Sequence, residues 1–217
     1  MQRAIIFANG EITPPYPSRA DFQPDDWFIA ADGGAIHFPR LGITPHTLVG
    51  DFDSLTSVEV DRMAHQGVQI VRHPAHKDET DLELALLHAV KRDVRQIIVY
   101  GALGARWDMT IANLMLLAHP ALINTHLSLI DGNQQVSLLR GGQTLQLQSK
   151  RGDTVSFIPL SPEARGITTS GLEYPLHNGI LTQGSPRGVS NVVIDEPCQV
   201  VMEEGMLVVV HIRQVSS

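Results

Sequence analysis

The sequence contains only one cysteine, Cys198, among its 217 residues. A single thiol excludes both an internal disulfide framework and a metal cluster built on several thiolates. Free cysteines are most often small buried residues, and we expect the same of Cys198.

The sequence also lacks an excess of basic residues and any long apolar segment. It carries 16 Lys and Arg against 23 Asp and Glu, which gives a formal net charge of −7. No block of Lys or Arg offsets this charge, which argues against general binding of nucleic acid. The N-terminal stretch MQRAIIFANGE has an apolar run too short for a signal peptide or a membrane span, and no later stretch approaches the length that a spanning helix needs. We therefore expect a cytoplasmic protein that binds neither nucleic acid nor membranes.

Several common catalytic patterns are absent as well. The glycine-rich GALGARWD lacks the Gly-Lys-Ser/Thr ending of a Walker A loop, and no G-x-S-x-G nucleophile elbow occurs. The ten histidines show no spacing typical of a metal site. His73 and His76 lie near acidic residues, but we expect them to be solvated loop residues.

The first 130 residues alternate short β-rich runs with helical patterns. Brief, mostly apolar runs are typical of strands covered on both faces, and their alternation with helices favours a parallel sheet. One helix is predicted over 82–92, with Thr80 and Glu83 as a capping box. Another is predicted over about 108–119, with Ile111, Leu114 and Met115 on its apolar face. The expected strands are residues 4–8, 27–31, 47–50, 68–72, 95–100 and 126–130.

The pattern changes after Asp131. Short alternating runs follow, separated by GG, SP, NG and EEG turns, and no helical pattern is evident. This is typical of a small antiparallel sandwich or barrel. We therefore predict a Rossmann-like α/β parallel-sheet domain over 1–132 and an all-β domain over 133–217. The clearest runs of the second domain are 136–139, 144–148, 154–158 and 206–212.

Charged side chains follow four successive strands of the expected parallel sheet. Ligands of such sheets bind beyond the carboxyl ends of the strands, so these side chains should meet at one edge. The last of the four turns is also rich in glycine. The charged residues are Asp32, then Asp51 and Asp53, then Lys77, Asp78 and Asp81, and finally Arg106 and Asp108.

Each acid also has a purely structural interpretation. Asp32 can initiate a turn, Asp53-Ser54 or Asp108 can cap a helix, and Asp81 suits a helix N-terminus. Four acidic turns at one edge would nevertheless repel one another without a cation. Mg²⁺ prefers oxygen ligands and bridges carboxylates to phosphates, while a glycine-rich turn and Arg106 suit phosphate oxygens. The edge therefore predicts a site for a magnesium nucleotide or another polyphosphate.

Five motifs, in order, closely resemble those of the bacterial thiamine pyrophosphokinases. They are ADGGA (31–35), GDFDS (50–54), KDETDLELAL (77–86), GALGARWDMTIANL (101–114) and GVSN (188–191). The resemblance implies an α/β catalytic domain that binds ATP and Mg²⁺, followed by a β-sandwich domain that binds thiamine. It also implies a homodimer with the thiamine site near the interface. The implied reaction converts ATP and thiamine to AMP and thiamine diphosphate.

The resemblance also implies roles for individual residues. Asp51, Asp53 and Asp81 would hold Mg²⁺ on the ATP phosphates, and with Arg106 and Asp108 they form the expected catalytic set. Asp32 or Asp108 would orient or deprotonate the thiamine hydroxyl, and the sequence does not choose between them. The residues expected to bind ATP are Asp32, Lys77, Asp78, Thr80, Gly101, Gly104 and Arg106, and those expected to bind thiamine are Asp32, Ser190 and Asn191.

Two positions depart from the family pattern GGR-x-DH. Ala105 replaces the second glycine, which narrows the backbone freedom of the turn. Met109 replaces the histidine, so no proton transfer is assigned to that position.

Two other functions fit part of the sequence. A Mg²⁺-dependent phosphohydrolase would use Asp51 as its nucleophile, but it would want Thr or Val where Leu55 stands and would leave the β-rich half unexplained. A nucleotide-sensing module would bind at the acidic edge without catalysis. Release of AMP that depends strictly on thiamine separates these alternatives from the implied kinase.

Overall fold

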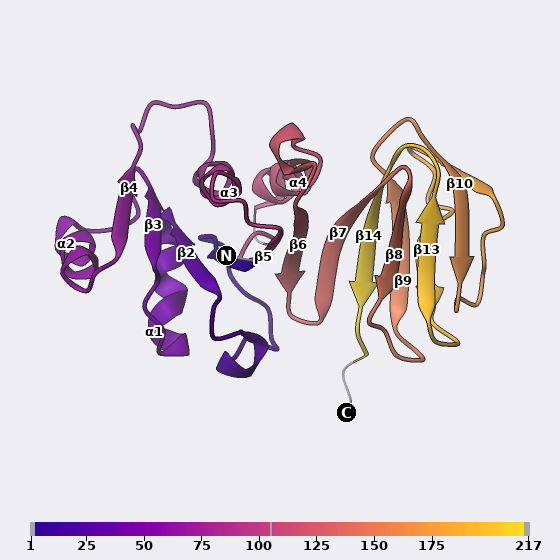
Figure 1. Ribbon diagram of the computed structural model, residues 1–217, viewed down its shortest axis with the longest axis horizontal. Coiled ribbons are helices and arrows are strands. Elements are labelled where there is room, and N and C mark those ends of the chain that lie inside the picture. Colours follow the sequence, from indigo (N-terminus) through magenta and orange to yellow (C-terminus); the bar gives the residue numbers. More distant parts are fainter. Residues whose placement is uncertain (1–2, 105, 215–217) are drawn as a thin grey trace. The chain divides into compact units, whose positions relative to one another are not determined.

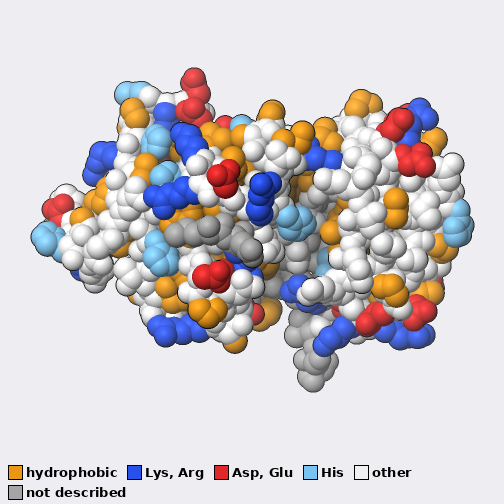
Figure 2. Space-filling view, in the orientation of Figure 1, with side chains coloured by type: hydrophobic (Ala, Val, Ile, Leu, Met, Phe, Trp, Pro, Cys, Tyr) orange, Lys and Arg blue, Asp and Glu red, His pale blue; other side chains and the backbone are white. Residues whose placement is uncertain are grey.

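The computed structural model describes residues 3–104 and 106–214. Its contacts divide the chain into two compact units, Met1–Gly132 and Asn133–Ser217. Basic, acidic and hydrophobic side chains are interspersed on the face that Figure 2 shows. No helix in the described ranges is long and apolar enough to cross a membrane.

Parallel strands form the sheet of the first unit. The central strands are buried along almost their whole length, as their apolar sequences require, whereas β4 at the edge is half-exposed. All the strands expected before residue 132 are present, with bounds close to those predicted. Across the sheet their order is β6 (His126–Asp131), β5 (Gln96–Tyr100), β1 (Arg3–Phe7), β2 (Trp27–Ala31), β3 (Thr47–Gly50) and β4 (Gln69–Arg72).

Helices cover both faces of this sheet. Figure 1 shows α3 (Asp81–Val90) and α4 (Trp107–Leu116) on one side of the strands and α1 (Phe38–Leu41) on the other. Helix α3 buries Leu82, Ala85 and Ala89 against the central strands. On the opposite face, Phe7 packs edge-to-face on Phe38 with ring centroids 5.0 Å apart. The remaining helical segments are α2 (Ser57–His65), η1 (Arg19–Asp21), η2 (Asp32–His37) and η3 (Pro120–Leu122).

The predicted helix starts need correction. The Thr80 hydroxyl accepts a hydrogen bond from the Glu83 amide, but no described bond returns from the Glu83 side chain to close a capping box. The reciprocal box forms instead at α2, between Thr56 and Glu59, so neither Asp53 nor Ser54 caps that helix. Local spacing identifies residues that can form a cap, but tertiary packing decides where each helix begins.

Helix α4 also differs from its prediction. Its N-cap is Arg106, so Asp108 lies in the first turn and is not the cap. Ile111 and Met115 are 53% and 50% exposed, so the predicted apolar face is not buried as a whole. The helix turns Asn113 toward the interior instead, because the Asn113 side chain donates to the Ala102 carbonyl at 2.7 Å.

The second unit consists of antiparallel strands in two sheets that share one core. Alternate residues of β13, namely Cys198, Val200 and Met202, are buried with Phe157 and Val209 of the other sheet. This is the packing of a β-sandwich, and Cys198 is a core residue as expected. One sheet has the order β12 (Asn191–Val192), β9 (Thr154–Pro159), β14 (Met206–Ile212) and β7 (Gln134–Arg140); the other has β11 (Gly179–Thr182), β10 (Glu163–Ser170), β13 (Cys198–Met202) and β8 (Gln143–Leu147).

The sequence predicts β7, β8, β9 and β14 but not β10 to β13. Strand β10 contains Gly166, which has a φ of +65°, and its register with β11 shifts between Ala164 and Ile167. A bulge of this kind breaks the two-residue alternation on which strand prediction depends.

Candidate active site

The strand order of the first unit reverses at β1, which has β2 on one side and β5 on the other. Open α/β sheets bind ligands at such a reversal, beyond the carboxyl ends of the strands. The backbone beyond β1 and β5 stays paired, because Gly10 N donates to Gly101 O at 2.9 Å. Gly101 has a φ of +70°, and a Cβ there would lie 2.5 Å from the Ala8 carbonyl oxygen, so glycine alone permits this approach.

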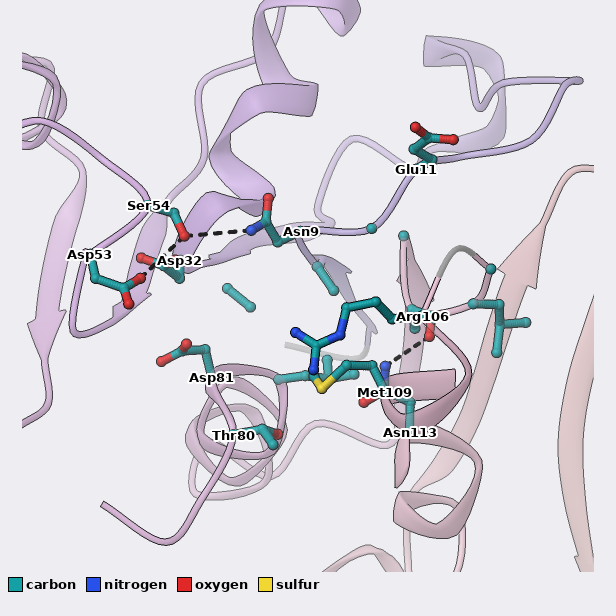
Figure 3. Close-up of a pocket in the computed structure, with 18 residues that line it drawn as sticks. Asn9, Glu11, Asp32, Asp53, Ser54, Thr80, Asp81, Arg106, Met109 and Asn113 are labelled. Carbon is teal, nitrogen blue, oxygen red and sulfur yellow. Dashed lines mark hydrogen bonds between the residues drawn. The ribbon is translucent and has the colours of Figure 1, made fainter. Parts of the chain in front are cut away.

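A cavity of about 460 Å³ lies at this reversal, a size typical of small-molecule sites. Figure 3 shows Asp32, Asp53 and Asp81 on one side of it and the Arg106 guanidinium reaching in from the other. All of its walls belong to the first unit. The lining residues follow β1 (Ala8, Asn9, Gly10, Glu11), β2 (Ala31, Asp32), β3 (Asp53, Ser54) and β5 (Gly101, Ala102, Leu103, Gly104), or begin α3 (Thr80, Asp81, Leu82) and α4 (Arg106, Met109, Asn113).

The acidic side chains converge closely. Asp32, Asp51 and Asp53 each offer a carboxylate oxygen, and these oxygens lie within 4.8 Å of one another. A Cβ at Gly50 would lie 3.0 Å from Asp32 Cβ and 3.1 Å from Asp81 Oδ1, so the missing side chain lets Asp81 approach the same place. A set of hard oxygen donors with this spacing is suited to a divalent cation.

Asp32 is the buried member of this set, with only 4% of its surface exposed. It begins η2 with a φ of +43°, a conformation that non-glycine residues rarely adopt and that concentrates at functional sites. Burial raises the pKa of Asp32; hydrogen bonds from Ser54 and Gly33 partly oppose this effect, and the charges of Asp81 and Asp53 add to it. Its Oδ1 has no hydrogen-bond partner among the described residues. Such a group is complete only with a proton, a cation or a ligand.

Lys77 joins two of the other acids. Its Nζ donates to Asp81 Oδ1 at 2.7 Å and to Asp51 Oδ2 at 3.1 Å. Burial disfavours the ammonium, but these hydrogen bonds outweigh burial and raise the pKa of Lys77. The hydrogen bond from Lys77 in turn lowers the pKa of Asp51.

Arg106 and Asp108 form a pair at the mouth of the site. Arg106 Nη2 lies 2.5 Å from Asp108 Oδ2, and both side chains are mostly exposed, at 73% and 64%. Arg106 lines the cavity, whereas Asp108 does not. Met109 also lines it, and Ala105 lies outside the described residues.

Six of the predicted site residues are not among those that line the cavity: Asp51, Lys77 and Asp108, described above, and Asp78, Ser190 and Asn191. Asp78 is exposed in the loop before α3, and Ser190 and Asn191 belong to the second unit. Ser190 is exposed with a φ of +62°. The buried Asn191 amide brackets the backbone of Tyr174, accepting from its N–H at 3.0 Å and donating to its carbonyl at 2.8 Å.

The sequence analysis does not predict the part of the cavity that follows β1. Asn9, Gly10 and Glu11 line this part, and Asn9 Nδ2 reaches Ser54 Oγ at 3.5 Å (Figure 3). A polar NGE turn directly after a buried strand is the signal that could have identified them. Asn113 has no comparable signal, because its role depends on the turn after β5 that it braces.

Comparison with known proteins links both units to one family. A family model described as "Thiamin pyrophosphokinase, catalytic domain" matches residues 21–129, and "Thiamin pyrophosphokinase, vitamin B1 binding domain" matches residues 143–207. The thiamine pyrophosphokinase of Bacillus subtilis is 31% identical over 184 residues, which cover 85% of this chain and 86% of that protein. The crystal structure of the thiamine pyrophosphokinase from Bacillus subtilis is similar with a TM-score of 0.85, at 28% identity, and covers 99% of this chain and 100% of that chain. The crystal structure of the thiamin pyrophosphokinase from Geobacillus thermodenitrificans is similar with a TM-score of 0.83, at 28% identity, and covers 100% of this chain and 99% of that chain.

Proposed function

The chain belongs to the thiamine pyrophosphokinase family, and we infer from this membership that it transfers the pyrophosphoryl group of ATP to thiamine, giving AMP and thiamine diphosphate. The observation that carries this inference is the cavity at the strand-order reversal, where carboxylates face Arg106 within the unit matched by the catalytic-domain model. Neither the phosphohydrolase nor the sensing module is favoured, because the family models and the curated relative that match the chain are those of thiamine pyrophosphokinases.

We propose that Asp51, Asp53 and Asp81 hold Mg²⁺ on the ATP phosphates and that Asp32 stands beside them. The residues fit this ion, because carboxylate oxygens of Asp32, Asp51 and Asp53 lie within 4.8 Å of one another and Asp32 Oδ1 has no hydrogen-bond partner among the described residues. Bound Mg²⁺ supplies neutralising charge to the phosphates. Asp81 and Asp51 are both hydrogen-bonded to Lys77, so their part in the metal site depends on that lysine.

The chain's own residues would align the reaction and neutralise its charge. The thiamine hydroxyl oxygen forms a bond to the β-phosphorus, and the bond from that phosphorus to the oxygen bridging the α-phosphate breaks, so AMP leaves with the electron pair. Such transfers depend mainly on alignment and charge stabilisation. We assign the turn Gly101–Gly104, with Thr80 and Lys77, to the nucleotide, and Arg106 to the charge that develops during transfer. Asp78 remains a proposed nucleotide contact from the loop before α3.

Asp32 is our choice for the group that orients the thiamine hydroxyl and takes its proton. It lies in the cavity wall, and burial raises its pKa, which makes its carboxylate a stronger base. Asp108 is less suited, because it lies outside the wall and its pKa is lowered by the hydrogen bond from Arg106. We assign Asp108 the task of orienting Arg106.

We further propose a homodimer in which the Ser190–Asn191 segment helps to bind thiamine near the interface. Ser190 offers an exposed hydroxyl, and Asn191 holds the segment against Tyr174. An apolar stripe on α4, consisting of Trp107, Ile111 and Met115, is exposed and supports a contact with a second copy. We also propose that the first unit is Rossmann-like, on the basis of its strand order. A cytoplasmic location is proposed as well, because the reaction needs ATP.

The function is tested by separating the nucleotide products after incubation with ATP and Mg²⁺, with and without thiamine. We expect AMP and thiamine diphosphate in equal amounts, and AMP only when thiamine is present. Phosphate released without thiamine would identify a hydrolase, and unchanged ATP in both samples would identify a binding module.

The dimer is tested by co-refolding Asp51→Asn with Asn191→Ala, each expected to be inactive alone. If the two units that complete a site come from different subunits, half of randomly paired dimers are mixed and each has one intact site. About a quarter of full activity should then return. A mixture that forms mixed dimers but stays inactive would show that each chain completes its own site.

A further inference from the structure

The Lys77 ammonium lies where a metal ion would be expected to act. Its side chain is only 10% exposed, and its Nζ bridges Asp81 at 2.7 Å and Asp51 at 3.1 Å. Both carboxylates belong to the proposed metal set, and the second oxygen of Asp51 accepts a long hydrogen bond, 3.2 Å, from the Asp53 amide. The protein's own cation therefore offsets part of the acidic charge.

A second cation near the site has a different arrangement. Arg72 Nη1 donates to the backbone carbonyl of Asp51 at 3.1 Å, and its guanidinium lies 4.5 Å from the centre of the Phe52 ring. Arg72 thus contributes charge to the same loop without occupying a carboxylate. It provides a matched comparison for Lys77.

We propose that Lys77 is an internal counter-ion that exchanges with the metal: it holds Asp51 and Asp81 before a divalent cation binds, releases them to that cation, and then donates to a phosphate oxygen of the nucleotide. The proposal rests on the metal and nucleotide sites inferred above. An ammonium and a divalent cation on the same carboxylates would repel each other strongly at this depth. Lysine is suited to such a move, because it is a compact charge on a flexible stem and is a common phosphate ligand.

The exchange couples the two ligands. A metal ion that binds alone must displace Lys77 from its carboxylates, which weakens metal binding. A nucleotide that arrives with the metal offers the displaced ammonium a new partner, and this strengthens metal binding. Lys77 thus makes metal and nucleotide bind cooperatively, and the effect is the same whichever binds first.

The test compares Lys77→Met with wild type and with Arg72→Met. Binding of Mn²⁺ without nucleotide is measured by electron paramagnetic resonance of the free ion, and binding of a non-hydrolysable ATP analogue is measured at saturating Mg²⁺. We expect Lys77→Met to bind Mn²⁺ alone about fivefold tighter and the analogue about fivefold weaker, the lower end of typical coupling. Arg72→Met should change Mn²⁺ binding by less than about twofold, because exposed charges that do not contact the ligand act weakly.

The two changes in opposite directions distinguish the proposal from its rivals. A lysine that only binds phosphate would leave Mn²⁺ binding unchanged, and a lysine that only positions the carboxylates would weaken it; either result overturns the exchange. If neither wild type nor Lys77→Met binds Mn²⁺, the proposed metal site is wrong, independently of Lys77. Should Lys77→Met unfold, Lys77→Gln keeps a hydrogen-bond donor without the charge, and tighter Mn²⁺ binding is expected there too.

Discussion

Two buried aspartates, one in each unit, have opposite surroundings. Asp153, in the sandwich, accepts hydrogen bonds from Lys150 N and Gln214 N, both at 2.9 Å, and from His211 Nε2 at 2.8 Å. Asp32, in the α/β unit, leaves Oδ1 without a partner among the described residues. Their exposed fractions are the same, 4% each. Burial alone therefore does not distinguish an acid that stabilises a fold from one that is held ready for a ligand.

The pKa values of the two aspartates move in opposite directions, because their hydrogen bonds differ. Burial acts to raise both. For Asp153 the hydrogen bonds from Gln214, Lys150 and His211 outweigh burial and lower the pKa, whereas for Asp32 burial prevails and the pKa is raised. A carboxylate satisfied by the protein contributes stability, and an unsatisfied one is tolerated where function needs it.

The largest expected effect is on catalysis, from Asp32→Asn. Removing the base should lower kcat about 100-fold or more. The melting temperature at pH 7 should stay the same or rise, because the variant no longer buries a charged carboxylate whose Oδ1 has no partner among the described residues. Thiamine-dependent AMP release and thermal unfolding check this, with Asp61→Asn on the exposed side of α2 as the control. A variant that melts lower and keeps its activity would remove Asp32 from the mechanism.

The reverse result is expected for Asp153→Ala. Loss of this carboxylate leaves His211 and two backbone amides without their hydrogen-bond acceptor. The free energy of unfolding should therefore fall by about 3 kcal/mol. Activity per folded molecule should be retained, because Asp153 lies in the sandwich core. Urea unfolding and kinetics at low temperature measure both quantities. Asp195→Ala, at an exposed position, should cost about 0.5 kcal/mol or less. If Asp153→Ala left stability intact but lost kcat, the contrast between the two aspartates would be wrong.

A smaller effect is expected from Arg106→Lys. Lysine keeps the charge but loses the planar fork that contacts two oxygens, so kcat should fall about tenfold with less change in KM. Steady-state kinetics with ATP and thiamine measure the split, and Arg62→Lys on α2 is the control. If Arg106→Lys had the same kinetics as wild type, Arg106 would have no role in the transfer step, and its pairing with Asp108 would be structural.

The smallest effect is the pH dependence of stability. The raised pKa of Asp32 means that this residue costs no stability below its ordinary value of 3.8 and becomes destabilising as pH rises through its folded value. The lowered pKa of Asp153 means that its contribution is present above 3.8 and is lost as pH falls through its folded value. Melting temperatures of Asp32→Asn and Asp153→Asn should therefore differ from wild type in opposite directions at pH 7 and converge toward it in acid. Parallel curves at all pH values would contradict both assignments.

The sequence by itself determined the local elements and the chemistry at their ends. Runs such as WFIAA and TLVG form strands because continuous apolar residues can be covered on both faces, and the acids that follow them reach one edge because parallel strands share a direction. The resemblance carried by GDFDS and KDETD identified the family, since those residues stand in order at these same turns.

Only the tertiary structure decided which distant groups meet. Placing β5 beside β1 is what brings the Asn9 turn to the cavity, and no local pattern encodes that pairing. The bridge from Lys77 to Asp51 spans 26 residues, and the exposure of Ile111 depends on which side of α4 faces the sheet. Periodicity and turn residues act over a few positions, whereas strand order, burial and ion pairing follow from the packing of the whole chain.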